Sequence, residues 1–79
     1  MAKWTLYHTE GCHLCEQAHS LITPLLTSEK SLLLTDIMTD KQLIAQYQVS
    51  IPVLENEHGQ QLFWPFTAEQ VQIFLALAD

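Results

Sequence analysis

The apolar residues follow two different periods in the first third of the chain. Side chains alternate over residues 3–8, with Trp4 and Leu6 on one face and Tyr7 on the other, and this alternation predicts a β-strand. After residue 12 the apolar positions recur every three or four residues, which predicts a helix with one buried face. Those positions are Leu14, Cys15, Ala18, Leu21, Ile22, Leu25 and Leu26. Pro24 removes a backbone hydrogen bond within this pattern, so we expect the helix to kink or to end just before it.

The middle of the chain predicts a second strand and a short second helix. Residues 31–37 contain three consecutive leucines between polar breaks, which favours a strand buried on both faces of a parallel sheet. A buried helix turn gives the same short apolar run. Thr39 and Gln42 then match a capping box, in which a threonine N-cap is followed three residues later by glutamine. We therefore expect a helix that begins after Thr39.

The last third predicts a hairpin and a final helix. Residues 51–56 and 60–64 are the two arms, and the turn between them contains Gly59, which tolerates a positive φ. Thr67 and Gln70 form another capping box before the helix. Its apolar stripe consists of Val71, Phe74, Leu75 and Ala78, widened by Ile73 and Leu77.

The predicted element order is β-α-β-α-β-β-α, within one domain that spans residues 1–79. A strand-helix-strand unit pairs its strands in parallel through a right-handed crossover, whereas a hairpin is antiparallel. We therefore expect an α/β protein with a four-stranded mixed sheet, flanked on both faces by three helices.

The charge of the chain limits its partners. Three lysines, no arginine and nine acidic residues give a net charge of −6 at neutral pH. Nucleic acid and anionic membrane surfaces repel such a chain, so we expect neither as a partner. The apolar stretches are shorter than a membrane span and no signal-peptide pattern opens the sequence, so we expect a cytoplasmic protein.

Both cysteines of the chain, Cys12 and Cys15, lie at the predicted turn from strand to helix. In a cytoplasmic protein, a C-x-x-C pair near a βαβ unit is typical of a redox motif. The N–H groups and the dipole at a helix N-terminus stabilise an anion and so lower the pKa of a thiol there. We therefore predict that Cys12 is the nucleophile of thiol–disulfide exchange and that Cys15, one helical turn further, is the resolving thiol.

Charged neighbours modify this prediction. Glu10 and Glu16 would raise the pKa of a nearby thiol, whereas protonated His13, between the cysteines, would lower it. Because a less stabilised thiolate makes a more reducing couple, the two acids favour a reducing protein. His13 is the histidine best placed to tune the site, and we count it among the candidate substrate-binding residues.

Two other functions compete with redox chemistry. Cys12, Cys15 and His19, with either His8 or His13, supply four ligands of the kinds that zinc accepts. These residues lie within twelve positions, whereas structural zinc sites usually draw ligands from two separate segments, so we predict no resident metal. The second alternative is a non-catalytic binding or accessory domain that keeps the motif.

Residues near the predicted strand ends supply further candidates. The Ile51–Pro52 bond at the start of a strand is able to be cis, and a cis bond would turn the Ile51 backbone outward, where it could pair with an extended substrate. Asp36 and Glu55 are acids near strand ends, and a carboxylate beneath the resolving cysteine could accept its proton. A solvated strand-end position is the simpler interpretation of Asp36.

Taken together, these motifs resemble the thioredoxin superfamily and, within it, the small bacterial glutaredoxin-like proteins. The segments that carry the resemblance are LYHTEGCHLC at 6–15, TDI at 35–37, YQVSIPVL at 47–54 and LFWPF at 62–66. C-x-x-C followed about forty residues later by Ile-Pro-Val is more specific than either motif alone. The resemblance implies a thioredoxin-like fold, with Cys12 as nucleophile, Cys15 as resolving thiol, Pro52 as a cis-proline packed beside them, and the Ile51 backbone as the substrate-pairing edge.

Two departures from the family pattern concern glutathione. Glutaredoxins that use glutathione usually carry a basic residue just before the motif, where this chain has Thr9 and Glu10. They also carry a Gly-Gly turn followed by an acid, where this chain has Trp-Pro-Phe-Thr at residues 64–67. The usual glutathione-binding residues are therefore missing, and we expect no cofactor. The expected partners are a protein or small-molecule disulfide or thiol, and a reductant that recycles the protein.

Overall fold

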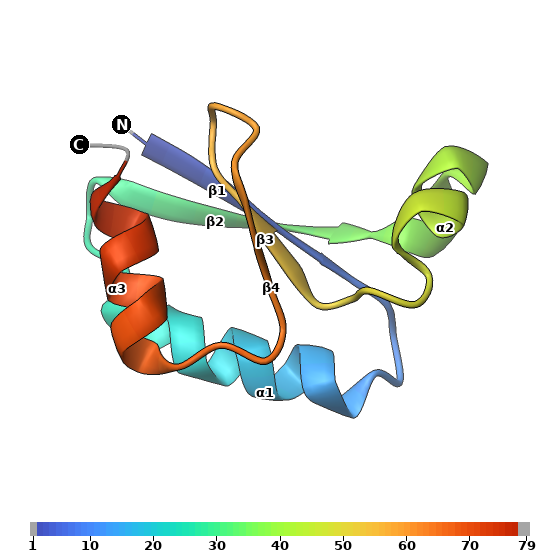
Figure 1. Ribbon diagram of the computed structural model, residues 1–79, viewed down its shortest axis with the longest axis horizontal. Helices are drawn as coiled ribbons and strands as arrows, with labels where there is room; N and C mark the ends of the chain where they lie inside the picture. The colour runs from blue at the N-terminus through green and yellow to red at the C-terminus, as the bar shows by residue number, and fades with distance from the viewer. Residues whose placement is uncertain (1, 78–79) are drawn as a thin grey trace.

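The computed structural model describes residues 2–77 and contains the predicted order of strands and helices (Figure 1). Its elements are β1 (Ala2–His8), α1 (His13–Ile22), η1 (Thr23–Leu25), β2 (Lys30–Asp36), η2 (Ile37–Thr39), α2 (Lys41–Tyr47), β3 (Val53–Glu55), β4 (Gln61–Phe63) and α3 (Ala68–Ala76). The 3-10 helices η1 and η2 are additions to the predicted order.

The four strands form one mixed sheet in the order β2-β1-β3-β4. β1 and β2 are parallel and in register, from Ala2 opposite Lys30 to His8 opposite Asp36. β3 runs antiparallel to both β1 and β4. The parallel pair is joined through α1, so the carboxyl ends of β1 and β2 lie side by side at one end of the sheet.

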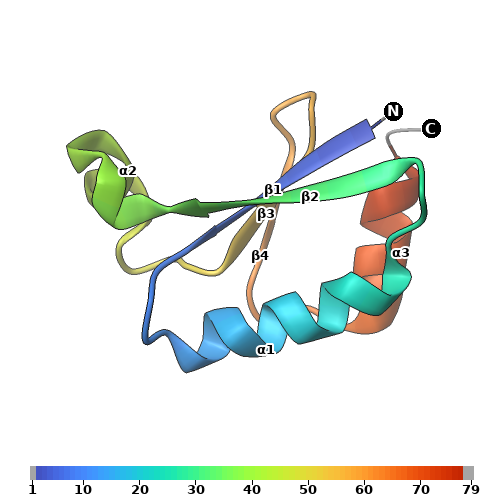
Figure 2. The same cartoon turned by 180° about the vertical axis from the view of Figure 1, so that it is seen from behind.

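Helices α1 and α3 pack against one face of the sheet, as Figures 1 and 2 show, and enclose the larger core. Trp4 and Leu6 of β1 point to this face, and so does Leu54, the register partner of Leu6 on β3. The buried residues of this cluster are Trp4, Leu6, Ala18, Ile22, Leu54, Phe66, Val71, Phe74 and Leu75. Since complete burial of one such side chain stabilises a fold by about 1.5–3 kcal/mol, this cluster is the main source of stability.

Helix α2 packs on the other face, near the carboxyl end of β2 (Figure 1). A smaller buried cluster lies there, made of Ile37, Tyr47 and Val53. The rings of Tyr7 and Tyr47 stack with their centroids 4.4 Å apart. Leu33 and Phe63 project from the strands on the same face and stay 63% and 50% exposed. The short helix therefore covers only part of this face.

The strand predicted at residues 31–37 is present as β2, but its predicted burial on both faces is wrong. β2 is an edge strand that pairs with β1 alone. Leu33 is 63% exposed on the face of α2, and Leu34 is 44% exposed on the face of α1. Because the helices do not reach over the outer edge of the sheet, the continuous apolar run here belongs to an edge strand.

The N-cap predicted for the second helix is off by one residue. Asp40 is the N-cap of α2, and its Oδ1 accepts a hydrogen bond from the Gln42 N–H at 2.8 Å. The hydroxyl of Thr39 donates instead to the Asp36 carbonyl at 2.7 Å and closes η2. The second predicted capping box, at the start of α3, is confirmed with both of its reciprocal hydrogen bonds.

The ends of the other helices follow the sequence in part. α1 ends at Ile22, and the chain continues through Pro24 as a 3-10 turn, as the proline predicted. Ile73 of α3 and its C-cap residue Leu77 are 58% and 56% exposed, so they do not widen the buried stripe. Ala78 lies outside the described residues. Within residues 2–77, no helix is long and apolar enough to cross a membrane.

Candidate redox site

The turn between β1 and α1 fixes the position of the first cysteine. The Cys12 N–H donates to the Thr9 carbonyl at 3.3 Å, which closes the turn. Gly11 has a φ of +83°, a conformation that side chains with a Cβ rarely adopt. The turn thereby leaves Cys12 as the N-cap of α1, with extended backbone angles (φ −88°, ψ 103°).

The two cysteines occupy different environments. The Sγ of Cys12 accepts a hydrogen bond from the Cys15 backbone N–H at 3.2 Å, the interaction that a serine or aspartate oxygen makes at an N-cap. Cys12 is partly exposed, whereas Cys15 is 3% exposed. Their Cα atoms are 5.2 Å apart and their sulfur atoms are at disulfide distance. The pair therefore consists of an accessible, hydrogen-bonded sulfur and a buried one.

The segment that carries Ile51 and Pro52 lies between α2 and β3, at the same end of the fold as the start of α1 (Figure 1). Pro52 is fully buried, and the Ile51–Pro52 peptide bond is cis. The Ile51 N–H donates to the Tyr47 carbonyl at 3.1 Å. The turn of residues 48–50 that follows α2 brings the Ile51 N–H to the Tyr47 carbonyl, so the N–H of the expected substrate-pairing edge is engaged within the chain.

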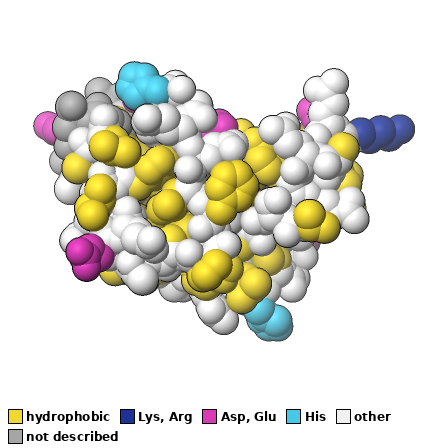
Figure 3. All heavy atoms as spheres, in the orientation of Figure 1, with side chains coloured by type: hydrophobic (Ala, Val, Ile, Leu, Met, Phe, Trp, Pro, Cys, Tyr) yellow, Lys and Arg dark blue, Asp and Glu magenta, His cyan; other side chains and the backbone are white. Residues whose placement is uncertain are grey.

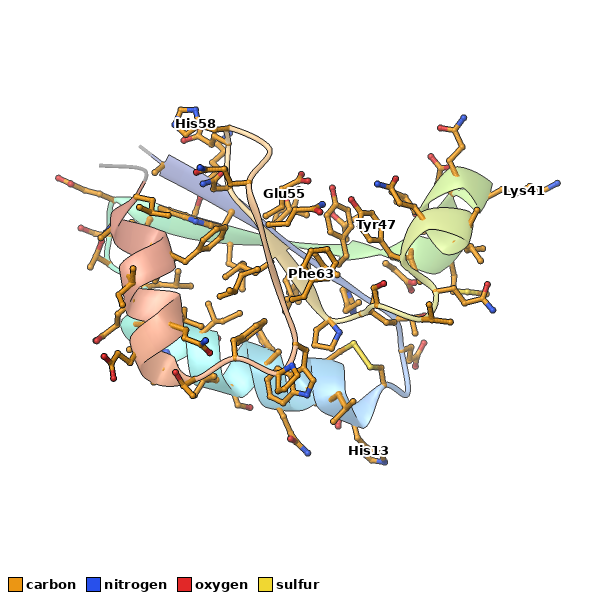
Figure 4. All side chains as sticks on the ribbon, in the orientation of Figure 1. His13, Lys41, Tyr47, Glu55, His58 and Phe63 are labelled. Carbon is orange, nitrogen blue, oxygen red and sulfur yellow. A yellow bond between two sulfur atoms is a disulfide. The ribbon has the colours of Figure 1, made fainter. Side chains whose placement is uncertain are left out.

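His13 does not lie against the sulfur atoms. Its side chain is 90% exposed and points away from the disulfide (Figure 4). The Nδ1 atom lies 3.4 Å from Oε1 of Glu16, whose side chain is 69% exposed. An exposed pair of this kind contributes little to stability. His13 is thus a surface residue at the rim of the motif.

A groove of about 400 Å³ opens on the buried side of the motif, between α1 and the carboxyl ends of the parallel strands. Its walls are formed by Leu6, His8, Thr9, Glu10, Gly11, Cys15, Glu16, His19, Leu34 and Asp36. The sequence prediction missed this groove. The signal that could have found it is the parallel pairing of β1 with β2, because ligand sites in open α/β sheets lie at the carboxyl ends of strands.

Asp36 lines this groove and also caps η2. Its Oδ1 accepts a hydrogen bond from the Met38 N–H at 2.9 Å. This bond, a bond to the Thr9 side chain and the nearby His8 hold the pKa of the carboxyl below its ordinary value. Glu55, the other candidate acid, lies on the opposite face of the sheet, where it accepts hydrogen bonds from Tyr7 and Gln61. The structure therefore brings Asp36, and not Glu55, into the groove beside Cys15.

The described part of the chain offers no support for the zinc alternative. Among residues 2–77, no group of three or more His, Cys, Asp or Glu side chains is arranged to hold a metal ion.

Comparison with known proteins identifies the family. Residues 3–76 match the glutaredoxin-like domain (DUF836). The chain belongs to this glutaredoxin-like family. The fold agrees with that of target protein XcR50 from X. campestris, known from an X-ray and a solution structure. The X-ray structure gives a TM-score of 0.81 at 32% identity, covering 96% of this chain and 99% of the other.

The solution structure of XcR50 gives a TM-score of 0.84 at 33% identity and covers 100% of this chain and 97% of the other. A search of curated proteins found no match. The family and these neighbours establish the thioredoxin-like α/β fold of this glutaredoxin-like domain. Its C-x-x-C pair lies at disulfide distance at the start of α1.

Proposed function

We propose that this glutaredoxin-like domain is a thiol–disulfide oxidoreductase in which Cys12 attacks and Cys15 resolves. The observation that carries the proposal is the asymmetry of the pair. The Cys12 sulfur is partly exposed and accepts the Cys15 N–H at 3.2 Å, whereas Cys15 is 3% exposed. An N–H directed at a sulfur on a helix N-terminus favours its thiolate, and the thiolate is the form that attacks a disulfide.

In the first step the Cys12 thiolate attacks one sulfur of a substrate disulfide, RS–SR′. A bond forms between the Cys12 Sγ and the RS sulfur, the S–S bond of the substrate breaks, and R′S⁻ leaves. The product is a mixed disulfide on Cys12. The partial exposure of Cys12 gives the substrate sulfur access, and the N-terminal end of α1 holds the thiolate in place.

In the second step the Cys15 sulfur attacks the Cys12 Sγ. The Cys12–Cys15 disulfide forms, the bond to the substrate sulfur breaks, and the departing RS⁻ takes up the proton that Cys15 gives up. Two electrons have then passed from the dithiol to the substrate. The Cα separation of 5.2 Å lies within the range that a disulfide spans, so the spacing of the two residues permits closure.

We propose a protein or small-molecule disulfide as the substrate in the cytoplasm, with no cofactor. A dithiol, or two monothiols, would return the Cys12–Cys15 disulfide to its reduced form. Glutathione recognition relies on cationic groups near the motif, and this site presents Glu10 and Glu16 there. On the face of the molecule that Figure 3 shows, the lysine side chain that is visible lies on α2, where Figure 4 labels Lys41.

The proposal is tested by equilibrating the protein in thiol–disulfide buffers from about −150 to −320 mV, a span that covers known couples. We expect one two-electron transition between the dithiol and the intramolecular disulfide, read by thiol alkylation and mass. A pair that stays reduced, or stays oxidised, across this span would contradict redox cycling.

A turnover assay separates catalysis from a non-catalytic binding role. We expect the protein to reduce insulin or a mixed disulfide when a dithiol is supplied, and Cys12→Ser to abolish this activity. Cys15→Ser should accumulate the mixed disulfide on Cys12 because the resolving thiol is gone. Activity that survives Cys12→Ser, or its complete absence in the unaltered protein, would remove the proposal.

A further inference from the structure

The outer edge of β2 is long, apolar and uncovered. β2 has seven residues, whereas the strand at the opposite edge, β4, has three. Its central five residues, 31–35, carry no charge and no proline, which are two of the features that commonly protect an edge strand. Leu33 and Leu34 are 63% and 44% exposed, one on each face of the sheet. Within residues 2–77, no strand pairs with this edge.

The sequence of β2 is complementary to itself when two copies run antiparallel. Centred on Leu33, the register places Leu33 opposite Leu33 and Ser31 opposite Thr35. Leu32 then faces Leu34, so apolar side chains meet on both faces of the joined sheet. At the two ends Lys30 of one strand lies opposite Asp36 of the other, which pairs unlike charges. A register shifted by two residues keeps one leucine pair at the axis, but it places the other two leucines opposite polar or charged residues and loses the charge match.

We propose that two copies of this chain associate through β2, in antiparallel register about a two-fold axis at Leu33. The two four-stranded sheets then become one sheet of eight strands. The new main-chain hydrogen bonds satisfy the outer N–H and C=O groups of the edge, as in other cases of strand addition. The interface is the same patch on both copies, which is the commonest arrangement of a homodimer.

The pairing also reaches the groove beside Cys15. Leu34 and Asp36 form its β2 wall, and directly opposed residues in an antiparallel pair share one face. The second copy therefore places its Leu32 and Lys30 next to this wall. The groove contains Glu10, Glu16 and Asp36, so the second copy adds a cation to an acidic site. The assembly itself does not depend on the redox function proposed above.

The interface is small, so we expect a weak dimer that is visible at high concentration. Sedimentation equilibrium over about 10 µM to 1 mM spans affinities from micromolar to millimolar. At about 0.15 M salt, the repulsion between two chains of charge −6 is largely screened. The weight-average mass should rise from 9.0 kDa toward twice that value. A mass that stays at 9.0 kDa up to 1 mM would overturn the proposal.

Two variants of equal charge test whether the interface lies at the β2 edge. Leu33→Lys places two like charges opposite each other at the axis and should weaken association by about tenfold or more. Ile73→Lys is the matched control. Ile73 is 58% exposed on α3, so this substitution adds the same charge at a site away from the β2 edge. Its association should equal that of the unaltered chain. Equal effects of the two substitutions would exclude the β2 edge as the interface.

A cross-linking experiment tests the register. Ser31→Cys and Thr35→Cys are each made in a chain that also carries Cys12→Ser and Cys15→Ser. Because residue 31 faces residue 35 in the proposed register, mild oxidation of the mixture should give mainly the 31–35 cross-link. Each variant alone should cross-link several-fold less. Equal yields from the mixture and from either single variant would contradict this antiparallel register.

Discussion

The two faces of the sheet are built differently from the same strands. On the face of α1 and α3, Trp4, Leu6 and Leu54 are completely buried among apolar side chains. On the face of α2, the strands present a polar network: the Tyr7 hydroxyl donates to Glu55 at 3.0 Å, and Gln61 donates to both Glu55 and Tyr47 at 2.9 and 2.7 Å.

The two faces differ because the helices cover different shares of the sheet on each side. α1 and α3, ten and nine residues long, span one face, whereas α2 has seven residues and lies at one end of the other. Apolar side chains on a face that water reaches are not removed from water and so stabilise the fold less. Hydrogen bonds between half-buried polar groups on such a face each contribute about 1 kcal/mol to the free energy of unfolding. The face of α1 and α3 therefore contributes more to the stability of the fold than the face of α2, which has the smaller buried cluster and the polar network.

The largest expected effect is on the face of α1 and α3. Leu54→Ala removes a fully buried side chain at the centre of the larger core and should lower the free energy of unfolding by about 2–5 kcal/mol. Phe63→Ala, on the half-covered face with its side chain 50% exposed, should cost less than about 1.5 kcal/mol. Urea denaturation of both variants measures the difference. Equal losses would show that the two faces contribute alike.

A smaller effect is expected from the polar network. Glu55→Ala leaves the Tyr7 hydroxyl and one Gln61 N–H without their acceptor, at a cost of about 1–3 kcal/mol in unfolding free energy. Glu57→Ala is the control, because Glu57 is exposed in the neighbouring turn and should change stability by less than about 0.5 kcal/mol. If the two variants unfold at the same urea concentration, the network does not stabilise the fold.

The smallest effect is a dependence on alkaline pH. Burial, together with the hydrogen bond to Glu55, raises the pKa of Tyr7 from 10.0 to about 12. Between these values the unfolded chain loses the tyrosine proton and the folded chain keeps it, so stability falls as pH rises from about 10 to about 12. Tyr7→Phe should remove this part of the decline, as urea unfolding at pH 8 to 11 would show. An unchanged slope in Tyr7→Phe would place the titrating group elsewhere.

Much of this arrangement could be predicted from local sequence. The C-x-x-C motif at a strand-to-helix turn, the effect of Pro24 and the capping box at Thr67 each depend on residues close in the chain. The family resemblance is confirmed by the match over residues 3–76. These features depend on backbone preferences that act over a few residues, so they can be predicted from the sequence alone.

The predictions that were wrong concern features that depend on which groups lie beside an element in the fold. The leucines of β2 resemble a central strand, yet the topology places them at an edge, because sheet order is not encoded in an apolar run. Thr39 has the right spacing for an N-cap, but its hydroxyl donates a hydrogen bond to the Asp36 carbonyl instead of capping α2.

The central claim is that the buried and the exposed sulfur of the motif have different roles. The most direct test is the rate at which each thiol of the reduced protein reacts with iodoacetamide, read by peptide mass mapping. We expect Cys12 to react at least about tenfold faster than Cys15, because the thiolate is the reactive form and Cys15 is 3% exposed. In urea the two rates should converge. Equal rates in the folded protein, or a faster Cys15, would contradict the account.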